Sequence, residues 1–175
     1  MRKTTMKTTT LFVLTVLALN SYAAPPEVQW SGQGTREESM TNSSGVILEG
    51  SEKFVSPDLF RPPVEITIVA KTDSTDLRIG YAADQVIFNW ADNLDELRAD
   101  GGPAGSRQVD GAGRIPKDKF VTIKWLVTPE HQAVYVDGRL RFENCGNYAE
   151  IIRPVSVFPA CGSLVTVKSI AVKQQ

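Results

Sequence analysis

The sequence predicts an all-β fold, a two-sheet antiparallel jelly-roll β-sandwich, and three observations support this prediction. Short segments in which apolar and polar residues alternate recur along the chain, and this period is typical of strands with one buried face. Segments with a helical period are almost absent, and the turns between strands are rich in Gly, Pro and Asp. No internal repeat occurs, which disfavours propellers and solenoids.

Two segments show the alternation most clearly. In residues 64–71 every second side chain is apolar, namely Val64, Ile66, Ile68 and Ala70. Residues 121–127 repeat the pattern with Val121, Ile123, Trp125 and Val127. Each segment is therefore expected to turn one face to a core and the other to water. Further strands are expected at residues 28–30, 46–49, 76–82, 85–90 and 155–158.

The segment 133–142 predicts a hairpin. Its centre, Asp137-Gly138, is typical of a type I′ turn, in which both central residues have positive φ. Such a turn would pair Tyr135 with Leu140 and Ala133 with Phe142 on one face. On the other face it would place Val134 and Val136 opposite the arginines at positions 141 and 139, namely Arg141 and Arg139.

Three other segments complete the expected organisation. The last strand, residues 164–173, changes phase at Ser169, which a β-bulge would explain. Residues Asp92 to Arg98 are interpreted as one helical turn. The glycine-rich residues 101–113 are expected to form a long loop inside the domain, because strands continue on both sides of it.

The N-terminus indicates export. Residues 1–10 carry three basic side chains and no acid, residues 11–19 are apolar but too short to cross a bilayer, and Ala23 ends a stretch suited to cleavage. Residues 1–23 are therefore predicted to be a signal peptide. Residues 24–175 would form one β-sandwich domain, with 24–45 partly flexible, and the protein would be secreted or periplasmic.

Charge and cysteine content narrow the function. Without the three basic residues of the signal, 16 basic side chains stand against 20 acidic ones, a net charge of −4. This balance argues against nucleic acid as a partner, and no second apolar stretch would span a membrane. In an oxidising compartment Cys145 and Cys161 are expected to form a disulfide, worth about 3 kcal/mol for such a loop. Zinc is disfavoured, because His131 is the only histidine.

The segment FVTIKWLVTPEHQAVYVDGRLRF, residues 120–142, resembles a segment of concanavalin A-like lectin and glucanase domains, which include laminin G-like and galectin-like sandwiches. The matching residues are Trp125 and Val136-Asp137-Gly138, and residues 164–174 resemble the final strand of those domains. The stretch 76–102 is similar to the galectin sugar face, although it lacks the His and Asn that precede the galectin arginine. The positions that match are Arg78, Asn89, Trp90, Glu96 and Arg98.

This resemblance implies carbohydrate recognition. A lectin site needs an aromatic ring for the apolar side of a pyranose and planar polar groups for its hydroxyls. Neighbouring strands carry such residues, and the predicted ligand-binding set is Arg78, Tyr81, Asn89, Trp90, Glu96 and Arg98. The expected partner is a carbohydrate or a cell-surface glycan. The alternative for each side chain is structural, with Trp90 closing the core and the arginines pairing with acids.

Two other classes of function stay open. Glucanases of this fold carry paired carboxylates along one strand, as in Glu-x-Asp-x-x-Glu, and the sequence has no such run. A glycoside hydrolase or polysaccharide lyase would need carboxylates from separate strands. A protein-interaction module is also compatible, because the fold does not fix the partner. We expect a binding domain rather than an enzyme.

The sequence gives no indication of a catalytic triad or of a bound cofactor. The single histidine lies in a Pro-Glu-His-Gln turn, and no Gly-x-Ser-x-Gly motif or phosphate-binding loop occurs. No cofactor is expected. Several relatives of this fold bind calcium through loop carboxylates and carbonyls, and Asp92, Asn93 and Asp95 would be the nearest candidate ligands. The favoured alternative for these three residues is a solvated turn.

Overall fold

The computed structural model describes residues 30–31 and 37–175, and within them it contains strands, turns and loops but no helix. The predicted signal peptide lies outside the described residues. No helix able to span a membrane occurs in these ranges. All paired strands in the described residues run antiparallel to each other.

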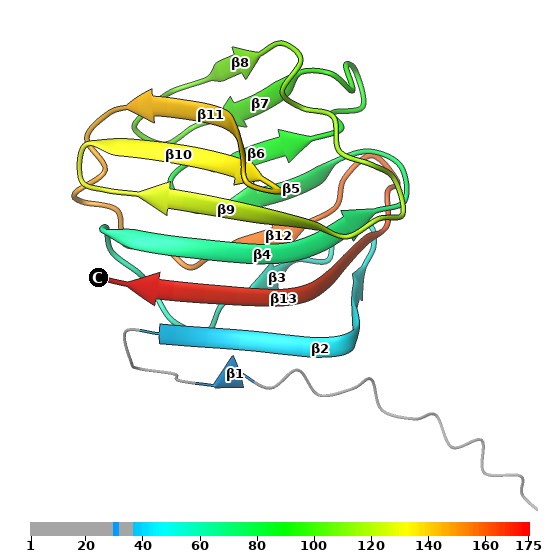
Figure 1. Ribbon diagram of the computed structural model, residues 1–175, viewed down its shortest axis with the longest axis horizontal. Coiled ribbons are helices and arrows are strands. Elements are labelled where there is room, and N and C mark those ends of the chain that lie inside the picture. Colours follow the sequence, from blue (N-terminus) through cyan, green and yellow to red (C-terminus); the bar gives the residue numbers. More distant parts are fainter. Residues whose placement is uncertain (1–29, 32–36) are drawn as a thin grey trace, which may run out of the picture.

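The strands form two sheets. The seven-stranded sheet, with the order β1-β2-β13-β4-β9-β10-β11, lies nearest the viewer in Figure 1 and is called the front sheet. Its strands are β1 (Trp30–Ser31), β2 (Glu37–Leu48), β4 (Val64–Thr72), β9 (Val121–Val127), β10 (His131–Val136), β11 (Arg139–Cys145) and β13 (Val165–Gln174).

The six-stranded sheet lies behind it and is called the back sheet. Its strand order is β3-β12-β5-β6-β7-β8. Its strands are β3 (Phe54–Val55), β5 (Leu77–Gly80), β6 (Gln85–Phe88), β7 (Leu97–Asp100), β8 (Arg107–Val109) and β12 (Ser156–Phe158). The predicted all-β, two-sheet antiparallel sandwich is therefore confirmed.

The core lies between the sheets and follows the predicted alternation. Val64, Ile66, Ile68 and Ala70 of β4 are all buried, and so are the four alternate residues of β9. Trp125 is the largest fully buried side chain. Its indole Nε1 donates to Gln132 Oε1 at 2.9 Å, and Gln132 Nε2 donates to the hydroxyl of Tyr148 at 3.0 Å. This internal chain supplies partners for polar groups that burial would otherwise leave unpaired.

The predicted bulge in the last strand is present. The pairing of β13 with both β2 and β4 shifts between Val167 and Ser169. Because the shift adds one residue to β13 relative to β4, Ile170 and Val172 return to the buried face that Val165 and Val167 occupy before it.

The hairpin was only partly predicted. Asp137 and Gly138 have φ values of 48° and 78°, as the type I′ turn requires, and Tyr135 lies opposite Leu140. The pairing of Ala133 with Phe142 was wrong, because a bulge between Val134 and Tyr135 in the register places Phe142 opposite Val134. The bulge turns Phe142 into the core. It also frees Arg141 from a position opposite Val134, and its Nη1 donates to the carbonyls of residues 112 and 114.

Two other local predictions need correction. Residues 92–98 do not form a helical turn, because residues 97 and 98 begin β7, where Leu97 is buried in the core. The predicted loop 101–113 contains the short edge strand β8 at residues 107–109. In both segments pairing with the neighbouring strand overrides the local preference.

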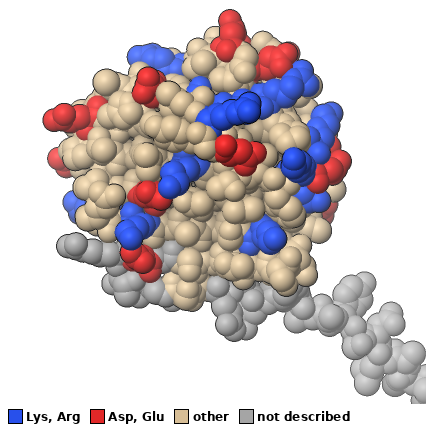
Figure 2. Space-filling model, viewed as in Figure 1, with Lys and Arg blue, Asp and Glu red and all other residues tan. Residues whose placement is uncertain are grey.

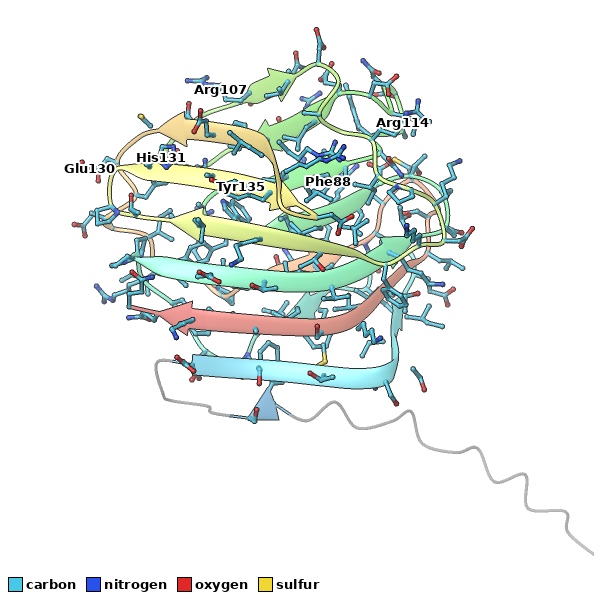
Figure 3. All side chains as sticks on the ribbon, in the orientation of Figure 1. Phe88, Arg107, Arg114, Glu130, His131 and Tyr135 are labelled. Atoms are coloured by element: carbon cyan, nitrogen blue, oxygen red, sulfur yellow. The ribbon has the colours of Figure 1, made fainter. Side chains whose placement is uncertain are left out.

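The predicted disulfide is absent, and both cysteines are free and exposed. Cys145 lies opposite His131, at the end of the sandwich where Figure 3 labels Glu130 and His131. Cys161 precedes Val165, which pairs with Thr72 at the other end of β4. A nine-residue strand is roughly 26 Å long, far beyond the reach of a disulfide.

Candidate functional site

The outward side chains of the back sheet form two rows across the strands. Residues 54, 77, 79, 86, 88, 97, 99 and 157 are in the core, so their strand neighbours point away from it, to the outer side of the sheet. The first row, called the cation row, consists of Lys53, Phe158, Arg78, Ile87 and Arg98. The second row consists of Val55, Ser156, Gly80, Gln85 and Asp100. This solvent-facing side of the back sheet is called the back face.

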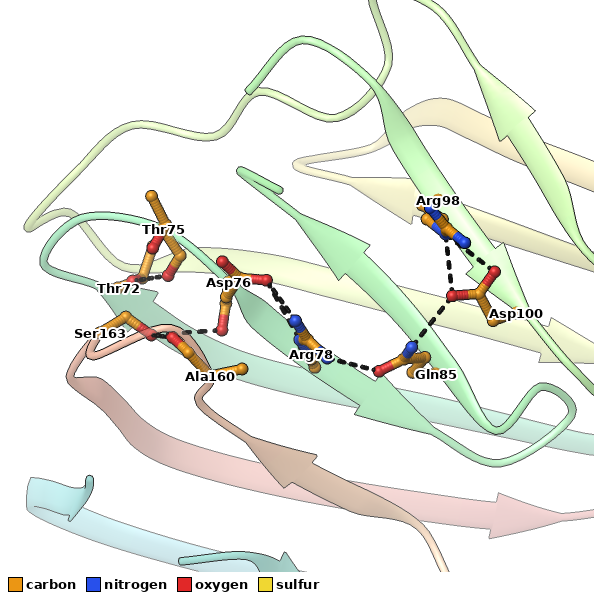
Figure 4. A network of polar contacts seen from close by, with 9 residues as sticks. All are labelled: Thr72, Thr75, Asp76, Arg78, Gln85, Arg98, Asp100, Ala160 and Ser163. Carbon is orange, nitrogen blue, oxygen red and sulfur yellow. Dashed lines mark hydrogen bonds and ion pairs between the residues drawn. The ribbon is translucent and has the colours of Figure 1, made fainter. Parts of the chain in front are cut away.

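A continuous chain of polar contacts crosses the back face. Arg78 donates through Nη2 to Asp76 Oδ1 at 2.7 Å and through Nη1 to Gln85 Oε1 at 2.8 Å. Gln85 Nε2 then donates to Asp100 Oδ2 at 3.0 Å, and Arg98 Nε donates to both carboxylate oxygens of Asp100 at 2.9 Å. Figure 4 shows this chain, which connects β5, β6 and β7. It fixes two guanidinium planes on neighbouring parts of one surface.

Arg98 also lies over an aromatic ring. Its guanidinium carbon is 4.7 Å from the centre of the Trp90 ring, a cation–π contact. Within the described part of the chain Arg98 makes hydrogen bonds only through Nε. Both Nη groups are therefore available to a ligand, in an orientation that Asp100 and Trp90 fix before binding.

Ile87 stands between the two arginines. It pairs with Arg78 on one side and Arg98 on the other, and it belongs to the back face rather than to the core cluster. It is nevertheless only 2% exposed. The aliphatic stems of long side chains commonly cover an apolar neighbour in this way while their charged ends stay in water.

A cleft of about 390 Å³ adjoins the chain of polar contacts at the turn between β5 and β6. Lys53, Val55, Gly80 and Ser156 from the back face contribute to its lining, together with Asp84 and Arg153. Arg153 Nη1 and Asp84 Oδ1 form an ion pair at 2.7 Å. A Cβ atom on Gly80 would lie 2.7 Å from Ser156 Oγ and 2.9 Å from the Asp84 carbonyl oxygen, so any other residue here would force its neighbours to shift.

Of the six predicted ligand-binding residues, the structure brings together Arg78, Trp90 and Arg98. Glu96 immediately precedes β7 and is half-buried, outside the chain of polar contacts. Its Oε1 atom is enclosed and makes no hydrogen bond with the described residues.

Asn89 has a structural role. It is 2% exposed and has a φ of 51°, which breaks the strand alternation and turns its side chain inward. Its amide Nδ2 donates to the carbonyls of Ser74 and Ile115, and its Oδ1 accepts from the N–H of Ile115. These bonds fasten the loop before β9 to the back sheet, so the side chain does not reach the back face.

Tyr81 also points inward. It is 1% exposed, and its ring meets that of Trp125 edge to face at 6.2 Å between centroids. Burial raises the pKa of Tyr81 well above its usual range. Tyr81 has the same strand parity as Leu77 and Ile79, which are both buried, so the alternation itself indicated its direction.

Sequence reasoning missed Lys53, Gln85, Asp100 and Phe158. Gln85 lies in a predicted strand and alternates with the core residues Val86 and Phe88. This alternation could have indicated that its side chain points to the outer side of the sheet. Lys53 and Phe158 come next to each other only because β3 pairs with β12, and β12 with β5. That order of strands cannot be read from the sequence.

The carboxylates of the chain of polar contacts and of the cleft each form an ion pair with an arginine. Asp76 pairs with Arg78, Asp100 with Arg98, and Asp84 with Arg153. Asp76 is fully buried, and its Oδ2 has no partner among the described residues. A general acid in glycoside hydrolysis must be free to donate a proton to the glycosidic oxygen, whereas these three carboxylates are engaged by guanidinium groups.

The candidate calcium ligands lie in the turn before β7 and take no part in the chain of polar contacts. Arg114 holds the Asp95 carboxylate at 2.6 Å, and this hydrogen bond lowers the pKa of Asp95. Asn93 Oδ1 accepts from the N–H of Asp95. No cluster of three or more His, Cys, Asp or Glu able to hold a metal occurs in residues 30–31 and 37–175.

The front sheet presents a different surface. Figure 2 shows basic and acidic side chains interspersed across it. Lys124 pairs with Glu65 and Lys173 with Glu37, both at 2.7 Å. These ion pairs on the opposite side of the sandwich provide controls for substitutions on the back face.

No protein-family model matches the sequence, and no curated protein matches it. Solved structures do. A galectin from Caenorhabditis elegans aligns with a TM-score of 0.53 at 12% identity, over 79% of this chain and 96% of the galectin. A β-glucanase from Bacillus licheniformis aligns with a TM-score of 0.55 at 10% identity, over 79% of each chain. The chain has the concanavalin A-like fold.

A third solved structure has the same architecture. It is described as a putative glycosyl hydrolase from Parabacteroides distasonis and aligns with a TM-score of 0.52 at 12% identity, over 87% of this chain and 92% of the other. These identities support a shared fold and carry no residue roles to this chain. The predicted resemblance to concanavalin A-like domains is thus confirmed at the level of the fold.

Proposed function

We propose that this chain is an exported, non-enzymatic domain that binds carbohydrate on the back face. The observation that carries the proposal is the chain of polar contacts from Asp76 to Arg98. It holds planar hydrogen-bonding groups in fixed positions on three neighbouring strands. Sugars are recognised by such planar groups, which reach two adjacent hydroxyls at once.

Preorganisation strengthens the proposal. The Arg78 side chain is 17% exposed and is held on two sides, so little rotamer entropy remains to be lost when a ligand binds. Trp90 is half-buried beneath Arg98. We propose that Arg98 contacts the sugar directly and that Trp90 positions the guanidinium. This assignment narrows the expected ligand-binding set to Arg78, Trp90 and Arg98, with Gln85 and Asp100 added.

We propose that the domain is not a catalyst, because the carboxylates of the chain of polar contacts and of the cleft are in ion pairs with arginines. A retaining or inverting glycosidase needs one carboxylic acid that donates a proton and a second carboxylate across the glycosidic bond. Asp76, Asp84 and Asp100 each have an arginine partner within 3 Å. Such pairing suits binding better than proton transfer, so we favour recognition over hydrolysis.

The test is a glycan array with the purified domain, followed by titration of the strongest hits while tryptophan fluorescence is recorded. We expect Arg98→Ala to weaken binding about tenfold or more, since it removes a charged hydrogen-bond donor. The control is Lys124→Ala on the front sheet, which removes a half-buried, ion-paired cation and should leave binding unchanged. Equal affinities of the wild type, Arg98→Ala and Trp90→Ala would refute the proposed face. Release of new reducing ends from any hit would refute the non-enzymatic part.

A further inference from the structure

The cation row has a regular composition. Across the strands the order is Lys53, Phe158, Arg78, Ile87 and Arg98, so basic and apolar side chains alternate. The ammonium of Lys53 lies 4.3 Å from the centre of the Phe158 ring, which places it at the end of this row. Strands are about 4.8 Å apart, so successive cations stand on strands roughly 10 Å apart.

The charges on this surface are not fully balanced. The back face and its cleft carry four cations, Lys53, Arg78, Arg98 and Arg153, against three carboxylates, Asp76, Asp84 and Asp100. These seven side chains together carry one positive charge in excess, although the whole chain has a formal net charge of −1. Lys53 is the cation of this set with no carboxylate within 4.0 Å among the described residues, and it lines the cleft.

The cleft is suited to a charged group. Lys53 and Arg153 both contribute to its lining, and the only acid there, Asp84, is already engaged by Arg153. An anionic group in the cleft would pair with Lys53 without displacing an existing ion pair. At the other end of the row, the free Nη groups of Arg98 could hold a second anionic group.

We propose that the ligand is an acidic polysaccharide, a linear chain with repeated carboxylate or sulfate groups that lies across the strands of the back sheet. One anionic group occupies the cleft beside Lys53, and another lies near Arg98. Phe158 and the apolar stems between the cations contact the sugar rings. This inference rests on the proposed function of the back face, and it adds the chemical class of the ligand.

Affinity electrophoresis in native gels tests the inference with matched polymers. Polygalacturonate and its fully methyl-esterified form share one backbone and differ in charge, and so do dextran sulfate and dextran. We expect retardation by polygalacturonate, dextran sulfate or both, and none by the neutral forms. The two anionic polymers distinguish a carboxylate from a sulfate ligand. Retardation should decrease as the salt concentration rises from 50 to 500 mM, because exposed charges are screened.

The variant Lys53→Met keeps the aliphatic stem on Phe158 and removes the charge. We expect it to weaken binding of the anionic polymer by up to about fivefold, the upper range for an exposed ion pair. Lys124→Met on the front sheet is the matched control and should change nothing. An equal loss in both variants would overturn the inference, because it would indicate non-specific attraction.

The two proposals fail in different ways. If neutral glycans bind as well as their charged counterparts and Arg98→Ala abolishes both, the acidic ligand is wrong and the proposed function stands. If none of the glycans on the array or in the gels binds, both proposals fall.

Discussion

Asn89 and Ile115 are joined by two hydrogen bonds. The Asn89 Nδ2 atom donates to the Ile115 carbonyl at 3.0 Å, and the Ile115 N–H donates to Asn89 Oδ1 at 2.8 Å. Both bonds are buried, and they connect the end of β6 to the loop before β9. The Asn89 amide side chain is therefore one of the contacts that join the back sheet to its long loop, beside the backbone bond from the Asn89 N–H to the Gly113 carbonyl.

Removal of this amide should destabilise the fold. We expect Asn89→Ala to lower the free energy of unfolding by about 2–4 kcal/mol, since it leaves buried backbone groups without partners. Asn93→Ala is the control, because Asn93 makes an exposed bond to the N–H of Asp95, and it should change stability by less than about 0.5 kcal/mol. Urea denaturation followed by circular dichroism measures both. Similar midpoints for the two variants would contradict the structural role of Asn89.

The internal chain from Trp125 through Gln132 to Tyr148 predicts coupled substitutions. Gln132→Leu leaves the Trp125 indole N–H unpaired and should cost about 2–3 kcal/mol. Tyr148→Phe removes the acceptor of Gln132 Nε2 and should cost about 1 kcal/mol. A double-mutant cycle should then give a coupling energy of about 1 kcal/mol, because the second change removes a bond that the first has already broken. Strict additivity would argue against the direct contact.

Asp73 gives the fold a dependence on pH. Its carboxylate accepts hydrogen bonds from the Leu164 N–H at 2.9 Å and the Ser74 hydroxyl at 2.7 Å. These bonds lower the pKa of Asp73, with the backbone bond to Leu164 as the largest cause. As pH falls, the unfolded chain therefore binds the proton first. The stabilising contribution is complete above the unfolded pKa of about 3.9 and is lost as pH falls through the lower folded pKa.

The measurement compares the wild type with Asp73→Asn, which retains a hydrogen-bond acceptor but does not titrate. The difference in unfolding free energy should be constant near neutral pH and should shrink below about pH 4. A difference that stays the same down to pH 2 would show that the Asp73 charge contributes nothing.

The cysteines offer a simple chemical check. Cys145 and Cys161 are exposed and unpaired, so both should react with a maleimide in the native, unreduced protein, as mass spectrometry would show. Because there is no bond to break, a reducing agent should leave the melting temperature unchanged. A protein that takes up label only after reduction would show that the two residues are bridged.

Alternation predicted the long strands because each has one buried face. It identified β4, β9 and the two halves of β13, and the change of phase at Ser169 located the bulge. The type I′ turn was also predicted, since Asp137-Gly138 is suited to positive φ. The bulge near Arg141 left no signal in the sequence. Phe142 has an apolar partner in either pairing, Ala133 in the predicted one and Val134 in the observed one.

The candidate site was less accessible to sequence reasoning. Arg78 and Arg98 were identified, and strand parity places both outward. Asn89 was misplaced because its positive φ reverses the side-chain direction at the end of β6. Lys53 enters the cation row only through the pairing of β3 with β12, which joins segments about a hundred residues apart. Such long-range neighbours depend on the order of strands, which local patterns do not encode.

The location of the ligand is the central claim, and backbone amide NMR tests it most directly. The experiment titrates the isotope-labelled domain with the tightest glycan from the array and follows the amide chemical shifts. We predict the largest changes at Arg78, Ile87 and Arg98, with a second group around the cleft at Gly80 and Ser156. Changes confined to β4, β9 and β10 of the front sheet would contradict the account.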